Sequence, residues 1–202
     1  MCIRDSSARV ADHPIHPMFT ERWSPRAFSG EPIPEAELFT LLEAARWAPS
    51  AYNAQPWRFI YTRRETESWK PVFDTLVEFN RSWAQRASAL VVIASAIEAT
   101  FPGREAAAPN PWHAFDAGAA WASLALQASL SDWAAHAMAG FDAVALRGVV
   151  ALPEEYAIHT VVAIGRLASK HVLPEALQPR EVPNDRRSLI QTVSEGQFSQ
   201  GV

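Results

Sequence analysis

Residues 113–130, HAFDAGAAWASLALQASL, constrain the fold more than any other stretch of the chain. The run is long enough only for a helix, and Asp116 is its one charged residue. Its side chains are apolar or small nearly all round, and a helix of that kind must be covered on every side. A single small domain covers a helix in this way with difficulty, so a subunit interface is a natural alternative to an internal position.

Composition places the chain among globular proteins. It has 202 residues, of which 49% are hydrophobic and 20% charged, and this length is most simply one domain. A formal net charge of −4 argues against a nucleic-acid surface and against a polybasic membrane anchor. The longest strongly apolar run, residues 89–97, is far too short to span a bilayer. We therefore expect neither a nucleic-acid nor a membrane partner.

The first ten residues, MCIRDSSARV, lack the apolar core of a signal peptide. The hexapeptide MCIRDS looks like translated adapter sequence, so residues 1–6 are interpreted as a non-native leader and the domain is expected to span residues 7–202. This interpretation also removes Cys2 as a candidate nucleophile. With one cysteine the chain cannot form an internal disulfide and carries no mark of an oxidising compartment, so we expect a cytoplasmic protein.

The spacing of apolar residues, and the prolines that bound the apolar stretches, predict helices alternating with strands. Helices are expected over residues 34–48 and 142–152, with a weaker one over 65–79 that is interrupted or starts near Pro71. Strands are expected over residues 57–62, 89–95, 133–138 and 157–165. The proline- and alanine-rich stretch 101–111 is expected to be an exposed loop, and the tail from Arg166 to lack regular structure. The sequence has no internal repeat and no second stretch of distinct composition, so a single domain is expected.

The segment RWSPRAF, residues 22–28, carries Arg22, Ser24 and Arg26 at alternate positions. In an extended conformation alternate residues point the same way, and two guanidinium groups with a hydroxyl suit a phosphate. The chain has no glycine-rich phosphate loop, so any such site needs side-chain cations. Arg186 and Arg187 near the C-terminus could add to them. The alternative for both stretches is a set of solvated surface arginines.

The segment APSAYNAQPWRF, residues 48–59, places Ser50, Asn53 and Gln55 in a loop between two apolar elements. Such residues favour local turns, which is one interpretation. The neighbouring tyrosine and tryptophan could instead wall a planar ring, whose edge the amides and hydroxyls would bond.

Other polar residues give weaker indications of a functional site. His13 and His16 could ligate a metal, but no acidic or cysteine partner lies nearby in the sequence, so no metal site is predicted. His136 lies in an apolar strand and is interpreted as a satisfied core histidine. Asp116 could relay protons, although a structural contact is the favoured interpretation. No G-x-S-x-G motif supports a serine hydrolase.

Taken together, RWSPRAF, APSAYNAQPWRF and AGFD resemble the FMN-dependent nitroreductase family, in order and in spacing, over about residues 16–189. The resemblance implies an α+β, three-layer fold with a mixed, mostly antiparallel central sheet flanked by helices. It also implies a homodimer with FMN at the interface, where the apolar helix 113–130 would lie, and NADH or NADPH as co-substrate.

The resemblance implies roles for individual residues. The implied FMN-binding residues are Arg22, Trp23, Ser24, Arg26, Pro49, Ser50, Ala51, Asn53, Gln55, Asn80, Ala139, Gly140, Arg186 and Arg187. Arg22 and Ser24 would hold the phosphate and ribityl chain. Arg186, with Arg187 as an alternative, would return to the same phosphate. Arg26 would face the N1/O2 edge of the flavin, where a cation stabilises the reduced anion.

The remaining roles divide between two chains. Residues 49–53 would come from the partner subunit, and Asn80 would bond the pyrimidine edge. Ala139 and Gly140 would approach flavin N5, which carries the hydride chemistry, so no side chain is assigned as catalytic. Trp83 stands where many members carry a lysine, and it is expected to line a pocket, as are Trp57 and Trp112.

Two functional classes follow from the resemblance. The first is an NAD(P)H-dependent FMN oxidoreductase that works by a ping-pong scheme on a nitroaromatic, quinone or enone acceptor. The second is a flavin-binding protein without nicotinamide turnover, which would serve flavin handling or a specialised oxidation.

Overall fold

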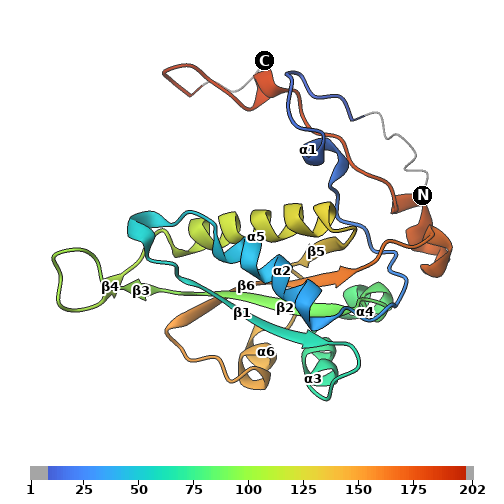
Figure 1. The fold of residues 1–202 in the computed structure, drawn as a ribbon, viewed down its shortest axis with the longest axis horizontal. Coiled ribbons are helices and arrows are strands. Elements are labelled where there is room, and N and C mark those ends of the chain that lie inside the picture. The colour runs from blue at the N-terminus through green and yellow to red at the C-terminus, as the bar shows by residue number, and fades with distance from the viewer. Residues whose placement is uncertain (1–8, 199–202) are drawn as a thin grey trace.

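The computed structural model describes residues 9–198, so the leader assigned to residues 1–6 lies outside the described part (Figure 1). The helices are α1 (Met18–Glu21), α2 (Glu35–Arg46), α3 (Trp69–Asp74), α4 (Glu78–Ala84), α5 (His113–Leu130) and α6 (Ala143–Val149). The strands are β1 (Trp57–Arg63), β2 (Ala89–Ala96), β3 (Glu98–Ala99), β4 (Ala108–Pro109), β5 (Ala134–Met138) and β6 (Tyr156–Gly165). Short 3₁₀ turns are η1 (Ala51–Asn53), η2 (Lys170–Val172), η3 (Glu175–Arg180) and η4 (Leu189–Gln191).

The main sheet has the strand order β1-β2-β6-β5, and each neighbouring pair runs antiparallel. In the centre of the sheet Val91 lies opposite Tyr61 on one side and Val162 on the other. The strands β3 and β4 form a separate hairpin. The predicted α+β fold with a mostly antiparallel sheet is confirmed.

The buried strand β2 explains why the fold has three layers, with the sheet between two layers of helices. Its side chains alternate between the two faces of the sheet, as in any strand. Val91 and Ile93 join one hydrophobic cluster with α2 and α5, whereas Leu90 and Val92 join a second cluster with α3, α4 and α6. In Figure 1 α2 and α5 lie on one face, and α3 and α6 on the other. A strand that is buried on both faces therefore requires helices on both sides of the sheet.

The helix α5 is covered on one side only. Its Ala117, Ala120 and Leu124 pack into the cluster with α2, in agreement with the predicted helix. On another face Phe115 is 81% exposed, and a Cβ added at Gly118 would meet nothing within 4 Å. The apolar character that the sequence shows all round α5 is therefore not fully buried within one chain.

A side-chain cap fixes the start of one helix, α6. Two element boundaries differ from those predicted. Asp142 caps α6 by accepting bonds from the N–H groups of Val144 and Ala145. The weaker helix predicted over residues 65–79 does start near Pro71, as α3, but it ends earlier than predicted, because the chain extends before α4, where Leu76 bridges to Phe141. The predicted loop 101–111 also contains β4 of the small hairpin.

The two terminal segments run side by side away from the layers (Figure 1). The backbone N–H of Leu189 donates to Asp12 Oδ2 at 2.6 Å, which ties the segments together. Within the described tail after Gly165 the helical elements are the 3₁₀ turns η2, η3 and η4, as the expected lack of regular structure suggested. This pairing brings the C-terminal arginines close to the RWSPRAF segment.

Within residues 9–198, no helix combines the length and the apolar character needed to cross a membrane.

Candidate cofactor site

Three arginines from separate segments gather beside the start of RWSPRAF. Arg22 Nη1 donates to Ser24 Oγ at 3.4 Å, so these two side chains share one side of the segment. Burial lowers the pKa of Arg22, and the nearby charges of Arg186 and Arg9 lower it further. Burial and the charge of Arg186 also lower the pKa of Arg9. The guanidinium groups therefore repel one another, and an anion with several oxygens would relieve that repulsion.

Arg9 was missed by sequence reasoning. Its Nη1 donates to the carbonyls of Thr20 and Arg22, at 2.7 and 3.0 Å. A single arginine among unrelated residues gives no periodic signal, and only the return of the N-terminal segment onto α1 shows its place. Arg186 is exposed, and its charge helps to lower the pKa of Arg22. Arg187 is also exposed and is not among the charges that lower the pKa of Arg22.

Arg26 lies further along the same segment in a half-buried position. Its backbone N–H and that of Ala27 both donate to Glu181 Oε1, each at 2.7 Å. The Nε of Arg26 is buried and has no hydrogen-bond partner among the residues that the structure describes. A buried donor without an acceptor is costly, so this nitrogen is ready for an acceptor from outside the chain.

Asn80 and Gly140, predicted to share one edge of the ligand, do lie together. Asn80 Nδ2 donates to the Gly140 carbonyl at 2.9 Å, and the same oxygen accepts from the Val77 backbone N–H at 3.1 Å. A Cβ added at Gly140 would lie 2.8 Å from both Asn80 Nδ2 and Val77 Cγ2. Glycine is therefore required here for close packing, while Ala139 beside it is exposed.

Trp83 does not line an open pocket, and that expectation is wrong. It is 2% exposed and packs between Phe28 and His136, with ring centroids 6.1 and 4.7 Å away. An indole on an inward face of α4 fills the core because its large apolar area is more stable there.

His136 is the hydrogen-bonded core histidine that the sequence suggested. Its Nδ1 donates to the Pro25 carbonyl at 2.9 Å. Burial lowers the pKa of His136, and the charge of Arg26 acts in the same direction. The imidazole is therefore neutral near pH 7 and adds no positive charge beside Arg26.

The polar loop between α2 and β1 is held in a strained conformation. Tyr52, Asn53 and Gln55 all have positive φ, at 53°, 54° and 47°. Left-handed backbone costs about 1–2 kcal/mol for residues other than glycine. Ser50 Oγ accepts from the Gln55 N–H at 3.0 Å, and the buried Asp116 carboxylate accepts from the Ala51 N–H at 3.2 Å. Asp116 thus makes the structural contact favoured from the sequence.

The predicted site residues fall into two groups. The segment 22–28, which carries Arg22, half-buried Trp23, Ser24 and Arg26, lies at the same end of the sheet as α4 in Figure 1. The loop of residues 49–55, with η1 and exposed Pro49, lies at the opposite end of the sheet in Figure 1. One chain therefore does not bring the two groups together.

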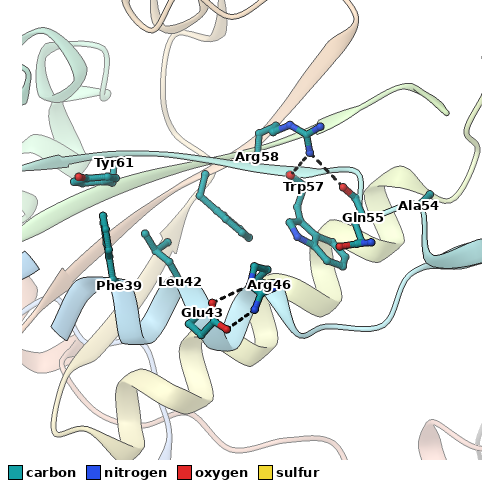
Figure 2. A pocket seen from close by; sticks show the side chains of 10 residues that line it. Phe39, Leu42, Glu43, Arg46, Ala54, Gln55, Trp57, Arg58 and Tyr61 are labelled. Atoms are coloured by element: carbon teal, nitrogen blue, oxygen red, sulfur yellow. Dashed lines mark hydrogen bonds and ion pairs between the residues drawn. The ribbon is translucent and has the colours of Figure 1, made fainter. Parts of the chain in front are cut away.

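Figure 2 shows an open groove between α2 and β1, of about 740 Å³. Phe39, Leu42 and Trp57 are among its lining residues, so the expectation for Trp57 is confirmed. Of the predicted FMN-binding residues, Gln55 alone lines this groove. The expected Trp112 instead contacts the Tyr52 ring on the surface, with centroids 5.8 Å apart. We therefore base the cofactor site on the arginines and on Asn80 rather than on the groove.

Fold and site together define a class: a three-layer α+β protein with an arginine-rich end and a strained polar loop at the other end. Residues 19–71 match the model of the Nitroreductase family. An NADH dehydrogenase of Thermus thermophilus is 30% identical to this chain in an alignment that covers 76% of this chain and 89% of that protein. The chain belongs to the nitroreductase family.

Solved structures agree with this assignment. A crystal structure described as an oxidoreductase containing FMN is 42% identical, has a TM-score of 0.92, and aligns over 98% of this chain and 99% of its own. A nitroreductase family protein from Clostridium difficile is 18% identical with a TM-score of 0.66, over 90% of this chain and 97% of its own. At that identity the second likeness supports the fold alone.

Proposed function

We propose that this chain is an FMN-dependent NAD(P)H oxidoreductase and that two copies share each FMN site. The observation that carries the proposal is the buried Nε of Arg26, which lacks a partner among the described residues and lies on the same segment as Arg22. The relative from Thermus thermophilus is named an NADH dehydrogenase, and the 42% identical structure contains FMN.

The residues present fit the phosphate and the ring of FMN. A phosphate suits Arg22, Ser24 and Arg186, because guanidinium groups and a hydroxyl donate to its oxygens. A flavin ring offers an acceptor edge, which suits the free Nε of Arg26. The Asn80 amide, held by its hydrogen bond to the Gly140 carbonyl, would bond the pyrimidine edge of the ring.

Bound FMN would transfer two electrons from NADH or NADPH to an acceptor of the nitroaromatic, quinone or enone type, the two substrates reacting in turn in a ping-pong scheme. The chain contributes binding and electrostatics. Arg26 places a positive charge at the ring edge that gains negative charge on reduction, and this favours the reduced cofactor. The neutral His136 adds no competing charge to that segment.

A second copy of the chain supplies what one copy lacks. Trp47, Tyr52 and Phe115 are 73%, 65% and 81% exposed, and they belong to the end of α2, the polar loop and α5. Burial of such apolar area favours association. In a homodimer the loop with Ser50 and Asn53 would meet the arginine-rich end of the partner, and this would complete the site.

The test is the purified protein itself. We expect non-covalently bound FMN, identified by its absorbance spectrum and by its release on denaturation. Anaerobic stopped-flow mixing with NADH or NADPH should bleach the flavin absorbance rapidly with at least one of them. Bound FMN that neither nicotinamide reduces would favour a flavin-binding protein without nicotinamide turnover. A colourless protein that takes up no added FMN would overturn the proposal.

A further inference from the structure

Glu181, which the sequence did not single out, makes an unusual contact with the RWSPRAF segment. It follows η3 directly, and its Oε1 accepts from two consecutive backbone N–H groups, those of Arg26 and Ala27, each at 2.7 Å. The residue is 9% exposed. Its second oxygen, Oε2, is buried and has no hydrogen-bond partner within the described part of the chain.

This contact fixes the position of Arg26. Two neighbouring N–H groups that converge on one oxygen form the arrangement by which backbone binds anions. The donors and the acceptor are 155 and 154 residues apart in the sequence, so the C-terminal tail clamps the N-terminal segment. The carboxylate of Glu181 thus replaces a β-ladder partner at this point.

The contact also places the carboxylate of Glu181 close to Arg26. Among the described residues, the Glu181 carboxylate of the tail bonds to the backbone of Arg26, and the imidazole of His136 on β5 lies close enough for the Arg26 charge to lower its pKa. Burial lowers the pKa of His136, so the imidazole is neutral near pH 7. The Glu181 carboxylate therefore lies beside the backbone of Arg26, and its burial leaves a charge there little screened by solvent.

We propose that Glu181 positions Arg26 at the flavin edge and that its negative charge holds the flavin midpoint potential below the value that Arg26 alone would set. The proposal rests on the proposed FMN site. Glu181 acts through Arg26 and through its field, and so is a positioning residue rather than a catalytic one.

Glu181→Gln separates the charge from the geometry, because the amide oxygen of glutamine can still accept from both N–H groups. We expect FMN affinity near that of the wild type and a more positive midpoint potential in a redox titration. Glu181→Ala removes the acceptor and leaves two buried N–H groups unpaired, so the FMN dissociation constant should rise roughly tenfold or more. Glu67→Gln, at an exposed turn position, is the matched control and should change neither quantity.

Two results decide the matter. A Glu181→Gln protein that binds FMN fully with the potential of the wild type would overturn the proposal and leave the FMN site itself intact. If the wild type binds no FMN, both this proposal and the proposed function fail. Should Glu181→Gln not accumulate as folded protein, Glu181→Asn, which is also neutral and keeps an amide oxygen that can accept, must show the same positive shift.

Discussion

Arg22→Ala is expected to weaken FMN binding by about 1.5–3 kcal/mol, the contribution of hydrogen bonds to a charged group, or roughly 10- to 150-fold in the dissociation constant. Arg22 is half-buried beside Arg9 and Arg186, and a phosphate would offset the repulsion among them. Isothermal titration of the FMN-free protein measures the change. Removal of one repelling cation should not lower the thermal stability of that FMN-free protein, which separates lost binding from lost folding.

Lys70→Ala is the matched control for a lost cation. Lys70 is exposed on α3 and pairs with Asp74 one turn away, on the face of the sheet opposite α5. We expect this variant to bind FMN as the wild type does. Equal FMN affinity in Arg22→Ala and Lys70→Ala would show that Arg22 does not hold the phosphate.

Gly140→Ala is expected to destabilise the protein by about 2–4 kcal/mol, from overpacking together with a lost hydrogen bond. The added Cβ would lie 2.8 Å from Asn80 Nδ2 and from Val77 Cγ2, so these two side chains must shift and the bond from Asn80 to the Gly140 carbonyl would break. Thermal denaturation should show a lower Tm. Because Asn80 belongs to the proposed site, FMN affinity should fall as well.

Gly148→Ala controls for the loss of a glycine as such. A Cβ at Gly148, on α6, meets nothing within 4 Å, and alanine favours helix, so the Tm should stay the same or rise. Equal Tm values for Gly140→Ala and Gly148→Ala would contradict the close packing described here.

Most of the fold could be predicted because the strongest signals are local. The unbroken apolar run of β2 requires two helical layers, and the residues of α5 can form only a helix. The break between α3 and α4 could not be predicted, since it depends on the bridge from Leu76 to Phe141 in a distant segment. Tertiary pairing overrides a weak helical pattern there.

The candidate site was predictable only where side chains alternate or cluster in sequence. Arg22, Ser24 and Arg26 share a short segment, so their common face can be read directly. Arg9 and Glu181 reach that segment from the two ends of the described chain, and no local pattern marks either of them. The burial of Trp83 likewise depends on Phe28 and His136, which lie on other elements.

Two copies of the chain are expected to share each FMN site, and complementation between two defective variants tests this directly. Arg22→Ala weakens the phosphate end, and Asn53→Trp fills the space in front of the polar loop, where Asn53 is exposed in the single chain. Each variant alone should bind FMN poorly.

In a mixed dimer, isolated with two different affinity tags, one site carries both defects and the other carries neither. We expect the mixed dimer to bind one FMN with the affinity of the wild type. If each site lay within a single chain, both sites of the mixed dimer would stay defective, and a titration that finds no site of wild-type affinity would contradict the shared site.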